Sequence, residues 1–486
     1  MRLSLPVPLA FVLAWTWMAR SQNAPAIQTT PALVTAKCSG CHPVPRPGAM
    51  ARHAWPTINQ SMVPILKQAG IPINEIELAA ITEYYVRNSP IELPLIPDDL
   101  GESLLTFEQT SIGPERNDER PQVTSLKLYD LDGDGREQDL VVTDNVIGAV
   151  TRLREKDGNW EEEILAQIPA PVNTTPVDFD GDGDVDLAVS AMGVMHPNDR
   201  LIGEFHLLVN EGDGSFEKRA LLTEVPRITD CAPGDFDGDG DIDFVLAMFG
   251  WRDTGAVGLL RQGEPGEFEL EEILRVNGCM RVLVNDVNGD EKPDFVALVT
   301  QQHEAILQFV NQGEARFEQH VISRANHPVF GTSSIALADL DGDGDEDILF
   351  TNGDMMDGNP EPKPYHGVRW LENNGSGGYA IHYLAGMPGC YDAKPVDMDG
   401  DGDLDIVYSA LYFHWHLHDF PSLAWMENKG GFREFVRRRI AYNPTNLCNI
   451  VIGDLNEDGK PDIIGGGMHV PGPTERKGRL TAWIQQ

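Results

Sequence analysis

Short apolar runs rich in β-branched and aromatic residues recur along most of this chain. Each run follows an acidic loop that contains glycine, and another short extended segment precedes that loop. The runs after the loops include Leu140–Val142, Leu187–Val189, Phe244–Leu246, Ile348–Phe350 and Ile406–Tyr408. A third strand-like segment then ends in Asn and Gly turn residues, and an aromatic residue opens a fourth. The pattern predicts a repeated unit of four short antiparallel strands joined by turns.

The acidic loops are the most regular part of this unit. One of them reads Asp397-Met-Asp-Gly-Asp-Gly-Asp-Leu-Asp405, with acidic side chains at alternate positions and glycines between them. Carboxylates this dense repel one another unless a hard cation lies among them, and oxygen-rich clusters of this kind suit Ca²⁺. Copies begin at Asp130, Asp178, Asp235, Asp286, Asp339, Asp397 and Asp454. The sequence therefore predicts seven related loops.

The spacing of the loops predicts the overall architecture. Repeats of roughly fifty residues are typical of solenoids, arrays and propellers, and four strands per unit favour propeller blades. The segment Leu104–Ile112 reads as a last strand with no blade before it, and Leu480–Ile484 reads as a third strand with nothing after it. Together these two segments complete one blade, which would close a seven-bladed ring and remove the open sheet edge.

A helical calcium loop of the EF-hand type is excluded. Such a loop takes a carboxylate ligand from its twelfth position. The twelfth residues here are Val141, Val189, Leu246, Ala297, Phe350, Tyr408 and Gly465. None of these side chains can bind calcium, and the flanking segments have the character of strands.

These repeats resemble the calcium-loop repeats of the integrin α-subunit propeller type, the FG-GAP or VCBS repeats, over residues 104–486. The resemblance implies a mainly β fold, a seven-bladed propeller, in which each acidic loop is a hairpin closed by its last aspartate. It implies up to seven Ca²⁺ ions. The predicted ligands are Asp130, Asp132, Asp134 and Asp139; Asp178, Asp180, Asp182 and Asp186; Asp235, Asp237, Asp239 and Asp243; Asp286, Asn288, Asp290 and Asp294; Asp339, Asp341, Asp343 and Asp347; Asp397, Asp399, Asp401 and Asp405; and Asp454, Asn456, Asp458 and Asp462.

Three of the loops depart from the repeat. The first carries one extra residue before Asp139, and the fourth has Asn288 and Glu291 where aspartate and glycine are expected. The seventh has Asn456 and Glu457. We expect these three loops to bind calcium more weakly than the other four.

The N-terminus reads as an export signal. A short basic start and an apolar run from Leu3 to Met18 are followed by Ala19-Arg-Ser21, whose small residues suit cleavage. Residues 1–21 are therefore predicted to be a signal peptide, with an uncleaved anchor as the alternative. The mature chain would have no transmembrane span and would lie in the periplasm or outside the cell, where calcium is abundant.

The next motif is Cys38-Ser-Gly-Cys41-His42. Cys-x-x-Cys-His is the attachment signature of c-type haem, in which both thiols bind the porphyrin and the histidine binds the iron. A redox dithiol would prefer a βαβ setting, and a zinc site would need a second ligand pair nearby, which the sequence lacks. One covalent haem c, held by Cys38, Cys41 and His42, is the predicted cofactor.

The haem motif opens a short helical region, residues 22–90. This region resembles the small exported cytochromes c, in which a Trp-containing stretch leads to the distal methionine. Trp55 leads to Met62, so Met62 is the predicted second iron ligand, while Met50 and His53 stay open as alternatives. A capped helix is predicted to begin after Asn74, and residues 91–103 read as a linker.

The negative charge belongs to the repeats. Residues 1–100 hold seven Lys and Arg and six Asp and Glu, so the remainder carries 30 basic against 70 acidic residues in a chain of net charge −39. Such a surface argues against nucleic acid as a partner.

Four further cysteines, Cys231, Cys279, Cys390 and Cys448, lie shortly before acidic loops. They could form two disulfides or remain four buried thiols, and the sequence leaves both possibilities open.

Two functions from different classes follow. The favoured one is electron transfer by a monohaem cytochrome, which exchanges electrons with a redox partner protein or a small-molecule donor or acceptor, while the propeller serves as docking scaffold. The alternative is an enzyme with its active site in a propeller mouth that carries histidines, acting as a metal-dependent lyase or dehydratase on carbohydrate, or as an oxidoreductase. Its candidate metal ligands are His414, His416 and His418, with His196, His366 and His469 on neighbouring loops. Whether the protein is an enzyme is left open by the sequence.

Overall fold

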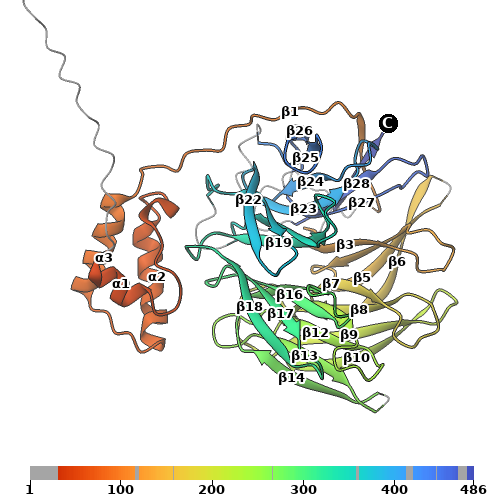
Figure 1. Ribbon diagram of the computed structural model, residues 1–486, viewed down its shortest axis with the longest axis horizontal. Coiled ribbons are helices and arrows are strands. Elements are labelled where there is room, and N and C mark those ends of the chain that lie inside the picture. The colour runs from red at the N-terminus through yellow and green to blue at the C-terminus, as the bar shows by residue number, and fades with distance from the viewer. Residues whose placement is uncertain are drawn as a thin grey trace, which may run out of the picture.

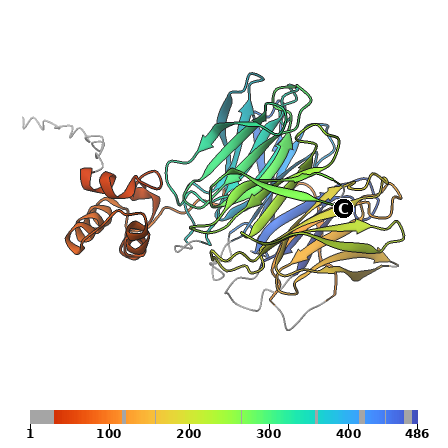
Figure 2. The same ribbon diagram turned by 90° about the horizontal axis from the view of Figure 1, so that it is seen from below.

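A helical segment lies beside a large β-structure in the computed structural model (Figure 1 and Figure 2). The structure describes residues 31–114, 120–156, 158–264, 266–356, 361–411, 420–444, 446–468 and 479–486. The helical elements are α1 (Ala32–Cys38), the 3-10 turn η1 (Pro47–Ala49), α2 (Trp55–Gln68) and α3 (Glu75–Asn88). The predicted signal peptide, residues 1–21, lies outside the described residues.

A small apolar core holds the helical segment together. Trp55 of α2 stacks on Tyr85 of α3 with ring centroids 3.9 Å apart, and Val34 of α1 and Met50 pack against the same cluster. The predicted cap of α3 is confirmed, because the Asn74 side chain accepts from the Glu77 amide at 2.9 Å and Glu77 accepts from the Asn74 amide at 3.0 Å. This capping box fixes where α3 begins.

Seven four-stranded antiparallel blades form the β-structure, which confirms the predicted propeller. Blade 1 holds β3 (Val123–Tyr129), β4 (Asp139–Asp144), β5 (Ala149–Lys156) and β6 (Asn159–Gln167). Blade 2 holds β7 (Pro171–Val177), β8 (Asp186–Ala191), β9 (Gly203–Asn210) and β10 (Phe216–Val225). Blade 3 holds β11 (Ile228–Gly234), β12 (Asp243–Met248), β13 (Ala256–Gln262) and β14 (Phe268–Leu274). Blade 4 holds β15 (Cys279–Asn285), β16 (Asp294–Val299), β17 (Ala305–Asn311) and β18 (Phe317–Arg324).

The remaining three blades follow the same order. Blade 5 holds β19 (Thr332–Ala338), β20 (Asp347–Asn352), β21 (Gly367–Asn373) and β22 (Tyr379–Gly386). Blade 6 holds β23 (Cys390–Val396), β24 (Asp405–Ala410), β25 (Leu423–Asn428) and β26 (Phe435–Ala441). Blade 7 holds β27 (Leu447–Gly453), β28 (Asp462–Gly467), β29 (Leu480–Gln485) and β2 (Phe107–Ser111). The first strand of each blade contacts the first strands of the blades on either side, so these strands line the axis of the ring.

Strands from both ends of the chain close the ring, as predicted. β2 pairs antiparallel with β29, with Phe107 opposite Gln485 and Ser111 opposite Thr481. Because one blade is built from both chain ends, the ring has no open edge between its first and last blades.

The predicted linker is attached to the propeller. β1 (Gly101–Glu102) pairs parallel with β26 and adds a fifth strand to blade 6. Before it, Asp98 forms an ion pair with Arg439 at 3.0 Å, and Asp99 forms one with Arg437 at 2.5 Å. The arginine-rich strand β26 thus fixes the linker to the outside of blade 6.

Apolar clusters fill the spaces between neighbouring blades, where residues such as Phe295 and Tyr408 are wholly buried. The four cysteines of the propeller, Cys231, Cys279, Cys390 and Cys448, are buried free thiols in this structure. None of the described helices is long and apolar enough to cross a membrane.

Candidate functional site

Each acidic loop joins the first strand of a blade to the second, as the sequence predicted. In the sixth loop, the amides of Gly400 and Asp401 donate to Asp397 Oδ1 at 2.8 and 3.1 Å, and the Gly402 amide donates to Oδ2 at 3.0 Å. Gly400 and Gly402 have φ values of 76° and 96°, a region that glycine enters without steric cost. The tight turn brings carboxylate oxygens of Asp397, Asp399 and Asp405 within 4.8 Å of one another.

The closing aspartate of the loop is part of the blade as well as of the acidic cluster. Asp405 is 1% exposed, and it accepts from the amide of Met398 at 3.1 Å and from that of Asn428 at 2.7 Å. Burial, with a smaller effect from Asp399 and Asp401, raises the pKa of Asp405 to about 7. Buried negative charge of this kind fits a site for a hard cation.

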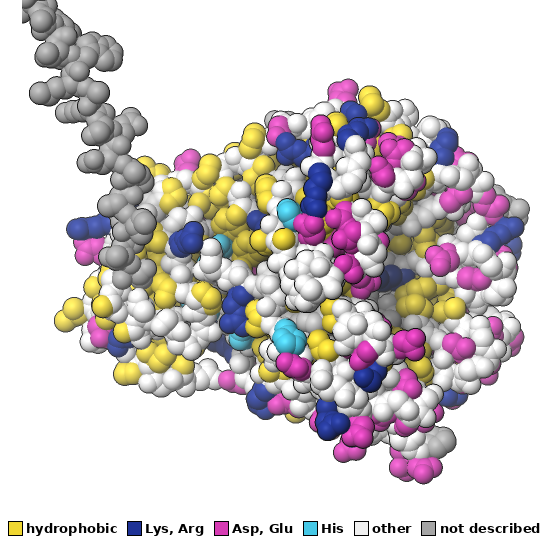
Figure 3. Space-filling view, in the orientation of Figure 1, with side chains coloured by type: hydrophobic (Ala, Val, Ile, Leu, Met, Phe, Trp, Pro, Cys, Tyr) yellow, Lys and Arg dark blue, Asp and Glu magenta, His cyan; other side chains and the backbone are white. Residues whose placement is uncertain are grey.

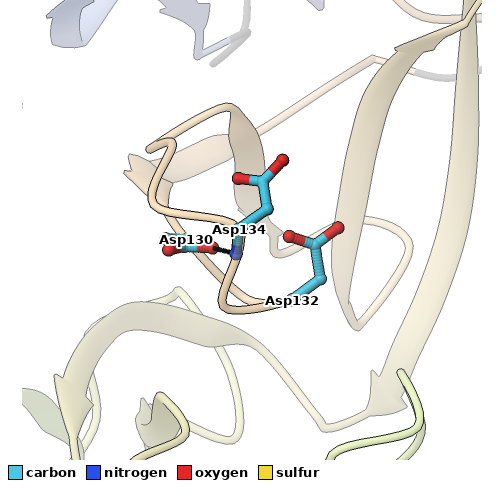
Figure 4. A group of neighbouring side chains, drawn as sticks. All are labelled: Asp130, Asp132 and Asp134. Atoms are coloured by element: carbon cyan, nitrogen blue, oxygen red, sulfur yellow. Dashed lines mark hydrogen bonds between the residues drawn. The ribbon is translucent and has the colours of Figure 1, made fainter.

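Five of the loops bring three carboxylates together, with oxygen atoms within 4.8 Å of one another. The groups are Asp130, Asp132 and Asp134; Asp178, Asp180 and Asp186; Asp235, Asp237 and Asp239; Asp339, Asp341 and Asp347; and Asp397, Asp399 and Asp405. Figure 4 shows the first group, in which the Asp134 amide donates to Asp130 Oδ1 at 3.1 Å.

The loops at Asp286 and Asp454, two of the three predicted to be weak, form no such carboxylate group among the described residues. Each carries a glutamate in the left-handed region that other loops give to glycine, Glu291 with φ 65° and Glu457 with φ 58°. Their closing residues Asp294 and Asp462 still accept backbone hydrogen bonds as Asp405 does.

In the first loop, an arginine contacts two of the carboxylates that were predicted to bind calcium. The Arg154 guanidinium donates to both carboxylate oxygens of Asp139 and lies 3.0 Å from Asp132 Oδ2. Sequence reasoning missed Arg154, although its place beside Asp139 follows from the register of β4 and β5, in which the next residues, Leu140 and Leu153, are paired.

The Cys-x-x-Cys-His motif begins at Cys38, the last residue of α1. Cys38 is half-buried at the end of the helix, and Cys41 is exposed. Burial raises the pKa of the Cys38 thiol. His42 Nδ1 lies 2.8 Å from the carbonyl oxygen of Pro43, so Nδ1 carries the proton and Nε2 is left as the nitrogen that can bind a metal.

The candidate distal ligands lie in different environments. Met62 is half-buried within α2, and Met50 is 1% exposed in the apolar core. His53 is exposed, and its Nε2 lies 3.0 Å from a carboxylate oxygen of Glu361 of the propeller.

The helical segment contacts the propeller through η1 and the end of α2. The Tyr365 hydroxyl donates to the carbonyl of Ala49 at 3.1 Å, and Gln68 donates to Asp253 at 2.6 Å. Burial lowers the pKa of His303, with smaller effects from Arg324 and His42. No sequence pattern marked this interface, because each contact joins residues far apart in the chain.

The histidines proposed for the propeller mouth do not form a described metal site. His414, His416, His418 and His469 lie outside the described residues. His196 is exposed, whereas His366 is wholly buried and accepts from the Gly389 amide at 3.2 Å. His366 packs inside the protein against Tyr365, which in turn contacts His327.

The fold and the loops define the class: a seven-bladed β-propeller that contains an FG-GAP-like repeat, to which residues 286–350 match. The chain is also similar to T-cell immunomodulatory protein of Mus musculus, 27% identical over 277 residues, which are 51% of this chain and 42% of the relative. The protein of that name from Rattus norvegicus is 26% identical over 267 residues, 49% of this chain and 41% of the relative. The chain thus spans less than half the length of these two relatives.

Proposed function

We propose that this protein is an exported monohaem c-type cytochrome that transfers single electrons, with a calcium-stabilised propeller as its docking scaffold. The observation that carries the proposal is His42, which follows Cys38 and Cys41 in the haem-attachment spacing and keeps Nε2 free while Nδ1 donates to Pro43. A carbonyl partner on Nδ1 is the outer contact that orients a metal-binding histidine.

The surroundings of the motif fit a haem group. Cys38 borders an apolar cluster to which Trp55, Tyr85 and Met50 contribute, and such a shell keeps water away from an iron centre. Haem bound there would supply one-electron chemistry. Cys38 and Cys41 would hold it through thioether bonds, and His42 would bind its iron through Nε2.

Met62 is the proposed second iron ligand. Its half-buried thioether on α2 has less packing to lose than Met50, which is 1% exposed within the core. In the haem-loaded protein, Met62→Ala is expected to lower the reduction potential, because methionine ligation raises it. Met50→Ala is expected to lower stability and leave the potential near that of the wild type, and the opposite pattern would assign the ligand to Met50.

The propeller is the proposed recognition part. The acidic side chains are spread over the propeller in Figure 3, which favours a basic redox partner or a small molecule over nucleic acid. Ca²⁺ ions in the acidic loops would neutralise part of this charge and fix the hairpins. The apolar run within residues 1–21 supports export to the periplasm or the cell exterior, where calcium is available.

The test is covalent haem attachment. The full chain, expressed with its leader in a host that matures c-type cytochromes, is expected to show a c-type α band and to keep haem after denaturation. Cys38→Ala with Cys41→Ala should abolish covalent haem, while His42→Ala should keep the thioether bonds and change the spectrum of the iron. Cys231→Ala, which removes a thiol outside the motif, serves as the control. Absence of covalent haem from the protein with intact Cys38 and Cys41 would overturn the proposal.

A further inference from the structure

Every blade places one polar side chain at the same position of its innermost strand. The position lies four residues before the strand residue that pairs with the closing aspartate. The seven residues are Ser125, Asn173, Asp230, Arg281, Ser334, Asp392 and Asn449. Because the innermost strands line the axis of the ring, the side chains at this position form one polar layer around that axis. We call these seven residues the polar ring.

Hydrogen bonds run around part of the polar ring. Ser125 Oγ donates to Asn173 Oδ1 at 2.9 Å, and Asn173 Nδ2 donates to Asp230 Oδ1 at 2.6 Å. The other carboxylate oxygen of Asp230 accepts from the amide of Val282 at 3.1 Å. Asp230 therefore has a hydrogen-bond partner on each of its oxygen atoms.

The second carboxylate of the ring is held in the same way. Asp392 Oδ1 accepts from Ser334 Oγ at 2.7 Å, and Asp392 Oδ2 accepts from the amide of Ile450 at 3.0 Å. Lys394 Nζ, two residues further along β23, is 2.9 Å from Asp392 Oδ1. Both acidic groups of the ring are thus occupied by partners from the protein.

Among the residues that the structure describes, two cationic side chains near the axis, Lys127 and Arg281, lack hydrogen-bond partners of this kind. Lys127 is partly exposed on β3 and makes no hydrogen bond or ion pair among the described residues. Arg281 approaches Asp230 only at 3.9 Å, and its guanidinium makes no hydrogen bond within the described part of the chain. Since buried or channel-lining cations are normally paired, the N–H groups of Lys127 and Arg281 are unused donors.

These groups lie close together although they come from different blades. Burial lowers the pKa of Lys127 to about 8, and the positive charges of Lys394 and Arg281 lower it further than Asp230 and Asp392 raise it. Lys127 belongs to blade 1, whereas the other four residues belong to blades 6, 4 and 3. Blades 1, 4 and 6 are not neighbours, so their side chains meet at the axis of the ring, where Lys127, Arg281 and Lys394 face Asp230 and Asp392 among the described residues.

We propose that a small oxyanion, such as sulfate, phosphate or a carboxylate, binds at the axis of the ring through Lys127 and Arg281. An anion at this point would accept the unused N–H groups and balance the excess positive charge. The whole chain has a net charge of −39, which repels anions at long range. Anion binding at the axis would therefore depend on the local positive charge of Lys127 and Arg281. The ligand class is set by the donors: an ammonium group and a planar guanidinium both recognise anionic oxygen.

The test uses sodium sulfate as the probe, with the full-length, calcium-loaded protein at constant ionic strength set by sodium chloride. Wild type is expected to bind sulfate saturably in calorimetry and to show a matching rise in Tm. Lys127→Met and Arg281→Gln should each weaken sulfate affinity by tenfold or more, and Lys127→Arg should retain binding. Lys67→Ala, which removes an exposed lysine on α2, is the control and should bind as wild type does.

Two outcomes would overturn the proposal. One is sulfate binding by Lys127→Met and Arg281→Gln that matches wild type, and the other is a linear Tm increase with sulfate in all variants, which is the general effect of an excluded salt. Sulfate keeps its charge near neutral pH, so loss of wild-type affinity above about pH 8, absent in Lys127→Arg, would place the titrating group at Lys127. In this pH experiment the facing groups Asp230, Asp392, Arg281 and Lys394 are the same in both proteins.

Discussion

Arg154 donates to both oxygens of Asp139, the closing carboxylate of the first acidic loop, with Nη2 2.6 Å from Oδ2. The same guanidinium lies 3.0 Å from Asp132. A cation of the protein therefore balances two carboxylates that calcium would use in this loop. Guanidinium and Ca²⁺ compete for the same oxygen atoms, so Arg154 gives a physical reason for weak calcium binding at this position.

Removing this guanidinium should open the first loop to calcium. Arg154→Met keeps the length of the side chain and frees Asp132 and Asp139, so one additional Ca²⁺ per chain is expected in titration calorimetry of the metal-free protein. Lys156→Met, on the same strand, removes an exposed positive charge that lies 3.9 Å from Glu161 and should leave the number of sites unchanged. Equal calcium stoichiometry in wild type and Arg154→Met would show that the arginine does not compete with the metal.

Comparing Asp405 with Asp462 separates the stabilisation of the fold by bound calcium from the stabilisation by the hydrogen bonds of the closing aspartate. Each closes its loop with two backbone hydrogen bonds, but only Asp405 belongs to a group of three converging carboxylates among the described residues. Changing either to Asn should leave one buried amide without its acceptor and cost about 1–3 kcal/mol.

Only Asp405→Asn should also lose stabilisation by calcium. A site filled at a hundred times its Kd stabilises a fold by about 2.7 kcal/mol. Urea unfolding of both variants with calcium and with EDTA checks this, since the difference between the two conditions should shrink in Asp405→Asn and stay at the wild-type value in Asp462→Asn. A similar reduction in both would mean that the seventh loop also binds calcium.

The ring and its loops were predictable because their signal is local and repeated. The alternation of acidic loop and apolar strand gave seven blades, and the unpaired segments around Phe107 and Trp483 gave the closing strand pair. Charge pairs across a hairpin, such as Arg154 with Asp139, require the register, which sequence patterns leave open. The burial of His366 was not predictable, because a loop histidine near the propeller mouth has the same sequence pattern whether its side chain points outward or into the core.

The helical segment shows the other limit of sequence reasoning. Its capping box, Asn74 with Glu77, lies within four consecutive residues and was predicted correctly. Its attachment to the propeller depends on Asp98 and Asp99 meeting the arginines of β26 and on Tyr365 reaching Ala49, and these pairs are hundreds of residues apart. No periodic pattern marks such contacts, so only the structure revealed them.

Tyr365 is expected to hold the helical segment on the propeller. Its hydroxyl is 3.1 Å from the carbonyl of Ala49 and 3.0 Å from that of Val329. Tyr365→Phe keeps the ring and removes this donor, which should weaken the contact by about 1 kcal/mol. Hydrogen exchange of the backbone around Ala49 should become several times faster, whereas Tyr383→Phe, at an exposed tyrosine of β22, should leave it unchanged. Unchanged exchange in Tyr365→Phe would mean that other contacts hold the segment.

Glu304 should make stability depend on pH. The side chain is 6% exposed and accepts from the amide of Thr332 at 2.9 Å, and burial raises its pKa to about 8 from an ordinary value of 4.5. Between these two pH values the folded state keeps a proton that the unfolded state has released. The stabilisation is therefore complete below pH 4.5, decreases as pH rises, and is lost above pH 8.

Glu304→Gln keeps a neutral acceptor for Thr332 but cannot ionise. Its free energy of unfolding should match that of wild type near pH 5 and exceed it at pH 8.5, on the order of a few kcal/mol. Urea unfolding at both pH values checks this, and the acidic loops do not interfere because both proteins carry them. Glu108→Gln, at an exposed position of β2, is the control and should track wild type throughout. If wild type and Glu304→Gln keep the same difference at both pH values, the carboxyl group of Glu304 is ionised throughout this range and its environment is more polar than its burial implies.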